Sequence, residues 1–442
     1  MRDLKIKDTP INFEVVRNKI IESGLKNVGT ASIRELVRLV NEIEAETGDK
    51  FVRMEMGVPG IMPPEVGTQA EIEALKRGVA SKYPMIDGIP QLKDEISLFV
   101  KNFLDVDVNR NGCIPTVGSM QGGFAVFLMT QNISKTKNKT LFIDPGFPVQ
   151  KQQLLVLGLD YESFDVYNYR GEALREKLES YLSSNEFTTI IYSNPNNPSW
   201  ICFNDTELQI IGEMANKYNV TIIEDLAYFA MDFRKDYSKP GEEPYQPTVA
   251  KYTDNWILLI SSSKSFSYAG QRIGMLVLSD KLYNKEFDSL NEKFGNPKFG
   301  YNMVYKILYS LSSGTAHSAQ YALHAMLKAE NEGTYNFIDD IKIYGERAGV
   351  MKKLFTNNGF NIVYDKDENE PLADGFYFTI SYPGLAGDEL IEELIYYGIS
   401  AISLKITGSE RTEGIRACVS QTSKDQFSDL EYRLQKFNEH HS

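Results

Sequence analysis

The sequence predicts an α/β protein whose main sheet is largely parallel and covered by helices on both faces. Segments rich in Ile, Leu and Val alternate with amphipathic segments between residues 140 and 280. This repeated alternation is typical of strand and helix units that build a parallel sheet. The chain of 442 residues is longer than one hydrophobic core usually serves. We therefore expect a large domain around the sheet and a smaller second domain.

The chain opens with helical segments, up to about residue 50. Between residues 31 and 45, apolar residues recur every three or four positions, which predicts a helix with one apolar stripe. A short strand follows from Phe51 and is broken by Gly57, Pro59 and Gly60. A glycine at such a break allows a ligand to approach the backbone closely, although a plain turn explains these residues as well.

Two loops rich in glycine or proline come next. Tyr83 lies in the first, Ser81-Lys-Tyr-Pro-Met-Ile-Asp-Gly-Ile-Pro90, which leads into a helix predicted at 91–103. A tyrosine in such a loop usually serves packing. The second loop, Gly118-Ser119-Met120-Gln-Gly-Gly123, follows an apolar strand at 113–117 and precedes a helix. Free backbone N–H groups at the start of that helix could bind a phosphate.

The alternating region supplies the predicted sheet. Strands are expected at 140–143, 188–192, 220–223, 257–260 and 275–278, with helices at 171–184 and 205–218. The second helix opens with Asn204 and carries Glu207 three residues later, which is a capping arrangement. In parallel sheets, ligands collect at the carboxyl ends of the strands. Polar segments follow four of these strands and end at Phe147, Trp200, Tyr228 and Lys264.

The segment from Trp256 to Gly274 has the clearest chemistry. An apolar strand ends in three serines and Lys264, and Arg272 follows eight residues later. Serine hydroxyls and a guanidinium bind phosphate, and an adjacent lysine forms a Schiff base with an aldehyde. This combination suits pyridoxal 5′-phosphate. A polar loop with two surface charges is the alternative interpretation of this segment alone.

The last third of the chain begins with a long helical region at 299–330 that continues to 357. Strands are then predicted at 376–381, 399–403 and 415–419. In the last of these, Arg416 lies on the face opposite the apolar one because strand residues alternate in direction. Such an arginine is either a solvated charge or a bidentate clamp for a carboxylate.

Composition narrows the class of function. The 60 acidic and 47 basic side chains give a net charge of −13, which argues against nucleic-acid binding and against an anionic membrane surface. The three cysteines are far apart, and the four histidines lack accompanying carboxylates, so no disulfide framework and no metal site are predicted. The charged N-terminus and the lack of a long apolar run predict a cytoplasmic protein.

Together these motifs closely resemble the aspartate-aminotransferase superfamily, the fold-type I pyridoxal-phosphate enzymes of the class I/II aminotransferase family. The resemblance runs from about residue 30 to residue 420, and the motifs occur in the family's order. It implies that Lys264 is the catalytic lysine that carries the cofactor. The implied cofactor-binding residues are Tyr83, Gly118, Ser119, Met120, Phe147, Asn197, Asp225, Tyr228, Ser261, Ser263, Lys264 and Arg272.

The resemblance also assigns roles to these residues. The glycine-rich loop, Ser261, Ser263 and Arg272 hold the phosphate, and Tyr83 reaches the phosphate in the partner subunit of a homodimer with shared active sites. Phe147 stacks on the pyridine ring, and Asn197 and Tyr228 donate hydrogen bonds to its oxygen. Asp225, as an anion, keeps the ring nitrogen protonated so that the ring accepts electrons. Arg416, with Gly57 and Asn197, binds the substrate.

The reaction implied is ping-pong transfer of an amino group from an L-amino acid to a 2-oxo acid through a Lys264 Schiff base. The freed lysine amine then acts as general base and general acid. Two residues depart from the family pattern. The loop that commonly reads N-P-T-G is Asn197-Pro-Ser-Trp200 here, and Met120 stands where some acidic-substrate members have a lysine. The second departure favours a neutral or aromatic amino acid as one substrate.

A lyase or decarboxylase on the same fold, such as a carbon–sulfur β-lyase, is the alternative enzyme. A regulatory protein that keeps this domain as a sensor would need a DNA-binding module, and the residues before Phe51 are too few and not basic enough. The expected domain boundaries are an N-terminal segment, 1–65, that joins the small domain, a large cofactor-binding domain at 66–305, and a small α+β domain at 306–442.

Overall fold

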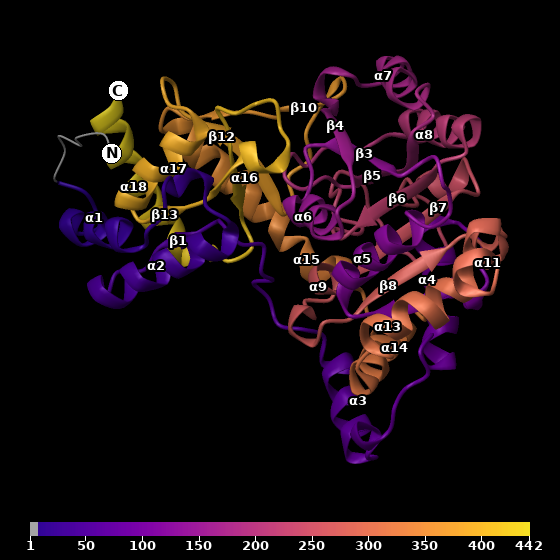
Figure 1. Cartoon of the computed structure of the whole chain (residues 1–442). Coiled ribbons are helices and arrows are strands. Elements are labelled where there is room, and N and C mark those ends of the chain that lie inside the picture. Colours follow the sequence, from indigo (N-terminus) through magenta and orange to yellow (C-terminus); the bar gives the residue numbers. More distant parts are fainter. Residues whose placement is uncertain (1–7) are drawn as a thin grey trace. The chain divides into compact units, whose positions relative to one another are not determined.

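The computed structural model describes residues 8–442, and contacts within the chain divide it into two compact units (Figure 1). The sheet unit contains residues 61–196 and 202–341. The terminal unit contains the described residues up to Gly60, the short segment Asn197–Ile201, and residues 342–442.

The sheet unit is built on seven strands in the order β2, β8, β7, β6, β5, β3, β4. Their bounds, in chain order, are β2 Cys113–Thr116, β3 Lys139–Asp144, β4 Tyr161–Asp165, β5 Phe187–Ser193, β6 Thr221–Leu226, β7 Trp256–Ser261 and β8 Gly274–Leu278. The five strands from β4 to β7 are parallel, and β8 runs antiparallel to both of its neighbours. The predicted mixed, mostly parallel sheet is confirmed. Every residue of β5, β6 and β7 is buried, which explains their apolar sequences.

Helices precede, connect and follow these strands. They are α3 Glu65–Lys76, α4 Pro90–Leu104, α5 Gly118–Thr130, α6 Pro148–Leu157, α7 Ala173–Leu182, α8 Asp205–Tyr218, α9 Ser262–Ser265, α10 Asp280–Asn284, α11 Asp288–Phe294, α12 Phe299–Asn302, α13 Tyr309–Ser312, α14 His317–Asn331 and α15 Phe337–Ile341. The helical region expected from residue 299 consists of several helices: the π-helical stretch Met303–Leu308 continues α12 into α13, and Ser313 ends α13 in a left-handed conformation. The predicted cap of α8 is present as a capping box of Asn204 and Glu207.

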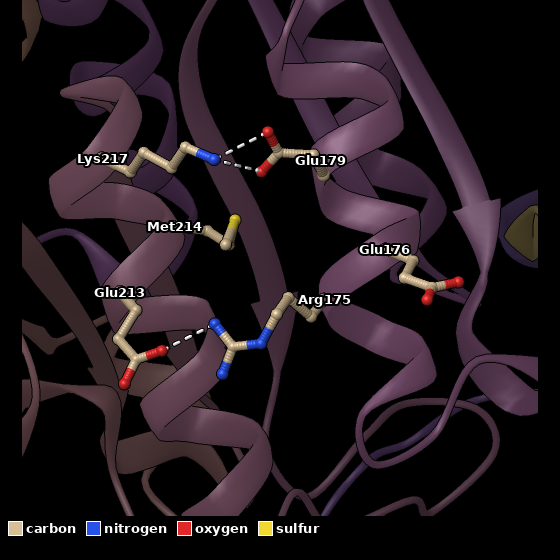
Figure 2. Close-up of a pocket in the computed structure, with 6 residues that line it drawn as sticks. All are labelled: Arg175, Glu176, Glu179, Glu213, Met214 and Lys217. Carbon is tan, nitrogen blue, oxygen red and sulfur yellow. Dashed lines mark hydrogen bonds and ion pairs between the residues drawn. The ribbon is translucent and has the colours of Figure 1, made fainter.

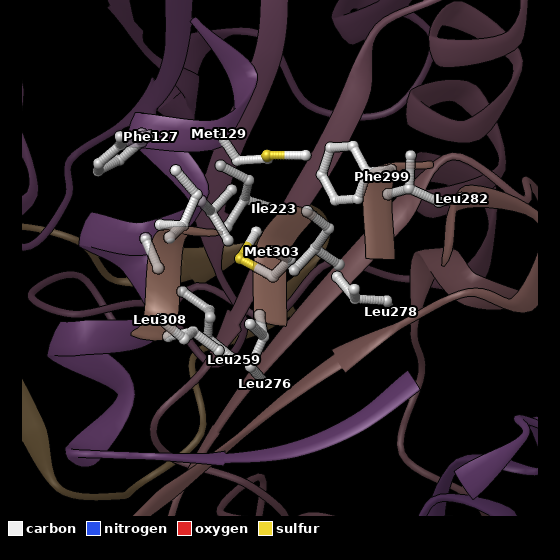
Figure 3. Packing of buried hydrophobic residues seen from close by; sticks show 14 of the residues in the cluster. Phe127, Met129, Ile223, Leu259, Leu276, Leu278, Leu282, Phe299, Met303 and Leu308 are labelled. Carbon is white, nitrogen blue, oxygen red and sulfur yellow. The ribbon is translucent and has the colours of Figure 1, made fainter. Parts of the chain in front are cut away.

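The core of this unit lies where α5 and the segment from α12 to α13 cover β6, β7 and β8 (Figure 3). Phe127 and Met129 of α5 pack with Ile223, Leu259 and Leu276 of the three strands, and all five side chains are buried. This packing fixes the carboxyl ends of β6 and β7, which carry the polar residues of the predicted site.

The terminal unit is an α+β structure, as predicted. Its strands are β1 Val52–Arg53, β9 Asn361–Ile362, β10 Lys366–Asp367, β11 Glu370–Pro371, β12 Tyr377–Ser381, β13 Ile399–Ser400, β14 Ile402–Ser403 and β15 Ile415–Cys418. An antiparallel sheet has the order β14, β15, β12, β9, and β1 pairs with β13 in parallel. The helices are α1 Phe13–Glu22, α2 Ile33–Thr47, α16 Ile343–Asn357, α17 Gly387–Tyr396 and α18 Phe427–His441. Helix α2 buries Leu36, Val40 and Ile43 of the predicted apolar stripe, together with Leu39, and begins with a capping box of Ser32 and Glu35.

Residues 306–341 belong to the sheet unit, whereas the predicted boundary at 305 assigns them to the small domain. The reason is the packing of α14, which lies against α3 and α4 (Figure 1). The Gln320 side chain also accepts a hydrogen bond from the backbone N–H of Ile89 at 2.8 Å. Boundaries of independently folding domains remain a prediction.

Candidate active site

Asp225 is the buried acid at the carboxyl end of β6. One carboxylate oxygen accepts a hydrogen bond from the Gln150 side chain at 2.8 Å, and the other accepts from the backbone N–H of Ala227 at 3.1 Å. Burial raises the pKa of Asp225 to about 6, although these two donors favour the anion. Among residues 8–442 no cation pairs with it. A ligand with a cationic N–H group would supply the missing partner.

An anion cradle lies at the start of α5. Gly118 has a left-handed backbone (φ +67°), and a Cβ there would come within 2.7 Å of an Arg272 guanidinium nitrogen. Glycine therefore lets the guanidinium approach the first turn of the helix, which also includes Ser119 and Met120. The free N–H groups of a helix start and a guanidinium both attract anions. The cradle fits a phosphate group.

Lys264 lies on the short helix α9, directly after β7. The Ser261 side chain caps this helix by accepting the Ser263 N–H at 3.1 Å, and the Ser262 hydroxyl donates to the Ile273 carbonyl at 2.6 Å. These bonds fix the turn that presents the Lys264 amine. Since β7 pairs with β6 in parallel, Lys264 and Asp225 follow neighbouring strands at the same edge of the sheet.

The aromatic candidates of the sheet unit differ in exposure. Phe147 is half-buried and immediately precedes α6, after β3. Tyr228 is buried, two residues beyond the end of β6. Tyr83 is 91% exposed, so the described residues of this chain do not enclose it. The structure thus brings Phe147 and Tyr228 to the strand ends and leaves Tyr83 on the surface.

The predicted substrate residues lie together in the terminal unit. Arg416 on β15 is only 1% exposed, which excludes the solvated-charge interpretation. Its guanidinium donates to the Asn197 side-chain oxygen at 3.1 Å and to the Glu55 carbonyl at 2.6 Å. No carboxylate among residues 8–442 pairs with it, and its Nε has no hydrogen-bond partner there. A buried guanidinium without a carboxylate is suited to binding a substrate carboxylate.

Gly57 lies beside the same group of residues. A Cβ at this position would lie 2.0 Å from the Tyr377 hydroxyl, so any larger residue would displace that side chain. The Tyr377 ring in turn lies against Arg416, with 4.3 Å between the guanidinium carbon and the ring centre. Glycine is therefore needed at this break in the chain because the Tyr377 side chain comes close to the backbone of Gly57.

A separate surface pocket lies over α7 and α8 (Figure 2). Four of its five charged residues pair with one another, since Arg175 contacts Glu213 at 2.7 Å and Lys217 contacts Glu179 at 2.8 Å. None of the predicted site residues lines this pocket. Within residues 8–442, no cluster of metal-ligating side chains is present. The described helices include none with the length and apolar character needed to cross a membrane.

Comparison with known proteins agrees with this geometry. Residues 50–430 match the model of the family described as aminotransferase class I and II. The chain belongs to this aminotransferase family. A probable aspartate aminotransferase of Methanocaldococcus jannaschii is 25% identical over 79% of this chain and 85% of its own. An LL-diaminopimelate aminotransferase of Natranaerobius thermophilus is 25% identical over 81% of this chain and 84% of its own.

The fold is also that of solved aminotransferases. The structure of an alanine aminotransferase from Pyrococcus furiosus superposes with a TM-score of 0.74 at 18% identity and covers 95% of this chain and 99% of its own. The predicted fold and the predicted enzyme class, a transaminase, are confirmed. The family favours amino transfer over the lyase or decarboxylase alternative.

Sequence reasoning missed two residues of this aminotransferase that contact the predicted site. Gln150 donates to Asp225, and Tyr377 lies against Arg416. Gln150 is 75 residues away from Asp225 in the chain, and no local pattern announces such a contact. Tyr377 lies in a predicted strand, and the register between β12 and β15 could have placed it near Arg416 if the pairing had been known.

Proposed function

We propose that this aminotransferase uses pyridoxal 5′-phosphate and moves an amino group from an L-amino acid to a 2-oxo acid in two half-reactions. One observation carries the proposal: the buried Asp225 carboxylate has no cation among the described residues. A protonated pyridine nitrogen is a cation of the right kind. The anion cradle at Gly118 and Arg272 suits the phosphate of the same molecule.

Each predicted residue then has a task in holding the cofactor. Arg272, the Gly118 to Met120 turn, and the Ser261 and Ser263 hydroxyls bind the phosphate, and Phe147 covers the ring. Asn197 and Tyr228 bind the ring oxygen, and Asp225 binds the ring nitrogen. Gln150 and the Ala227 N–H keep Asp225 oriented because each donates to one of its oxygens.

Lys264 is the proposed catalytic residue. Bound pyridoxal 5′-phosphate serves as an electron sink, so a proton can leave the α-carbon of an attached amino acid. Nζ of Lys264 accepts this proton as general base and later donates a proton as general acid. The Ser261 cap and the Ser262–Ile273 hydrogen bond hold the turn that presents this amine.

Arg416 is proposed to bind the carboxylate that both substrates share. Its burial supports this role, because a carboxylate would neutralise a charge that the described residues leave unpaired. Relatives and structural neighbours are named for aspartate, LL-diaminopimelate and alanine, so their names do not select one donor. Met120 offers no second cation, and we propose a neutral or aromatic amino acid as one substrate.

A homodimer with shared active sites is part of the proposal. The sheet unit exposes several large apolar side chains, among them Tyr83, Met85, Tyr301, Tyr305 and Tyr309. The last three recur every four residues along the helical stretch from α12 to α13 and form one strip. Exposed apolar patches of this kind are typical of subunit contacts. Light scattering after gel filtration should give the mass of two chains, and a stable monomer would contradict the proposal.

The proposed location is the cytoplasm. All three cysteines are free, which is compatible with a reducing compartment. The charge of −13 supports small-molecule substrates rather than nucleic acid.

Borohydride reduction of the cofactor-loaded protein, followed by peptide mass spectrometry, tests the cofactor and the lysine together. Added mass on the peptide with Lys264, and its loss in Lys264→Ala, is the expected result. Lys281→Ala, a change of an exposed lysine, should leave the labelling intact and serves as the matched control. Labelling of another lysine would contradict the role of Lys264. Failure to bind the cofactor at all would overturn the proposed cofactor.

A further inference from the structure

Trp200 has a backbone conformation that strongly favours glycine. Its φ is +68°, in the left-handed region, where a large aromatic residue is rare. The family pattern commonly has glycine at this position. Such strain persists only where the surrounding structure holds the residue in place. The contacts of the indole therefore identify what this tryptophan does.

The indole is held by a site that is shaped for it. Trp200 is 1% exposed and belongs to the segment Asn197–Ile201, which forms part of the terminal unit. A Cβ on Gly375 would lie 2.1 Å from the indole, so this glycine makes room for the ring. Two residues later, the Tyr377 ring meets the indole edge to face, with centroids 6.1 Å apart and an interplanar angle of 71°. Trp200 thus takes up space that Gly375 leaves and supports Tyr377.

Tyr377 links the indole to Arg416. In the antiparallel register of β12 and β15, Tyr377 lies opposite Cys418, two residues from Arg416, so both side chains lie on the same face. The guanidinium carbon lies 4.3 Å from the Tyr377 ring centre, within cation–π range. Arg416 also donates to Asn197, three residues before Trp200. The contacts therefore run from Trp200 through Tyr377 and Arg416 to Asn197. They start and end on the short segment Asn197–Ile201.

We propose that Trp200 is a positioning residue that orients the Arg416 guanidinium for the substrate carboxylate. It acts through the Tyr377 ring on one side and through the Asn197 segment on the other. This inference rests on the proposed role of Arg416 as the carboxylate-binding residue. The same contact makes the indole a reporter of what Arg416 binds.

Steady-state kinetics of Trp200→Gly and Trp200→Phe test the positioning role. Glycine fits the backbone and removes the ring, so KM for both the amino acid and the 2-oxo acid should rise about tenfold, as for a loss of orientation. Phenylalanine keeps a ring on Tyr377 and should change KM about two- to threefold. Gly375→Ala should mimic Trp200→Gly because its methyl group displaces the indole. Cofactor content should stay at the wild-type level in all three variants.

Folded Trp200→Gly and Gly375→Ala variants with wild-type KM values would overturn the inference. A variant that binds less cofactor, with KM unchanged, would also contradict it, since that result assigns the indole to the cofactor. A protein that shows no amino transfer even as wild type would instead refute the proposed function.

Fluorescence gives a test that does not depend on the folding of a Trp200 variant. The chain has two tryptophans, and the other one, Trp256, lies at the start of β7. In Trp256→Phe, all tryptophan emission comes from Trp200. Propionate, a monocarboxylate without an amine, should change this emission in a saturable way, and the change should vanish after Arg416→Leu. Saturable binding of propionate, followed by an independent method, with no change in emission would overturn the inference.

Discussion

Two buried arginines of this protein have opposite surroundings. Arg170, in the sheet unit, is 8% exposed and forms a two-point ion pair with Glu207, at 2.6 and 2.7 Å. Arg416, in the terminal unit, is 1% exposed and bonds to an amide oxygen and a backbone carbonyl. Glu207 also accepts the backbone N–H groups of Gly171 and Asn204, so each of its carboxylate oxygens accepts two hydrogen bonds.

The comparison separates a structural charge from a binding charge. A buried ion pair with satisfied hydrogen bonds holds two elements together, and removal of one partner leaves an uncompensated charge. A buried guanidinium without a carboxylate already bears the energetic penalty of an uncompensated charge in the free protein. Asp225 is the anionic counterpart, buried with two neutral donors only. Burial alone thus does not separate Arg170 from Arg416, and the presence of a counter-ion does.

The largest effect is expected from Arg416→Leu. The substrate carboxylate loses a charged, bidentate partner, so kcat/KM should fall about 1000-fold, equivalent to about 4 kcal/mol. The free energy of unfolding should not decrease, because the change removes an unpaired buried charge. Steady-state kinetics and urea unfolding of the same preparation measure both quantities. A loss of stability with unchanged kcat/KM would reverse the assignment of the two arginines.

Glu207→Gln should have the opposite outcome. The Arg170 charge loses its anion in a buried place, so the free energy of unfolding should fall by about 3 kcal/mol. KM for both substrates should stay near the wild-type value. The double variant Arg170→Met with Glu207→Gln should recover part of the stability, since no uncompensated charge remains. If the single variant unfolds at the wild-type urea concentration, the pair is not structural.

The Asp225 charge should appear as a pH dependence of stability in the cofactor-free protein. Burial raises its pKa from 3.8 to about 6, so the folded protein binds more protons between these values than the unfolded chain does. The free energy of unfolding should therefore decrease by about 2 to 3 kcal/mol as pH rises through this window. Asp225→Asn should remove this decrease.

Bound cofactor should reduce the same decrease, because a cation beside Asp225 lowers its pKa. Urea unfolding across the acidic pH range compares wild type and Asp225→Asn, each with and without pyridoxal 5′-phosphate. Identical pH profiles for wild type and Asp225→Asn would contradict the view that this carboxylate lacks a counter-ion.

The smallest effect is expected at the exposed ion pairs over α7 and α8 in Figure 2. Lys217 is 55% exposed and pairs with Glu179 on the surface. Lys217→Ala should leave the free energy of unfolding nearly unchanged, because water and salt screen such exposed pairs. Thermal unfolding of wild type and Lys217→Ala at low and high salt measures this change in stability. A loss of stability as large as that of Glu207→Gln would mean that exposure does not distinguish the surface pair Lys217–Glu179 from the buried pair Arg170–Glu207.

The sequence allowed much of the sheet unit to be predicted, because local patterns determine it. Buried parallel strands are continuous apolar runs, and the cap of α8 is a local pair of Asn204 and Glu207. Once the strands are predicted, their carboxyl ends are known, and these ends place Asp225 and Lys264. Strand β4 was missed because half-buried residues interrupt its apolar pattern.

The surroundings of Arg416 could not be predicted in the same way. Alternation placed it on one face of a strand but left open whether water or protein covers that face. The answer depends on Asn197 and Glu55, which lie 219 and 361 residues away in the chain. The packing of α14 on α3, which moves residues 306–341 into the sheet unit, also depends on distant contacts.

A single half-reaction tests the central claim most directly. The cofactor-loaded protein is mixed with an excess of one amino acid in the absence of any 2-oxo acid, and keto acid and ammonia are both measured. Amino transfer predicts one keto acid per active site, no ammonia, and the amino group retained on the protein until a 2-oxo acid is added. Continued release of keto acid together with ammonia would contradict the account and identify a lyase.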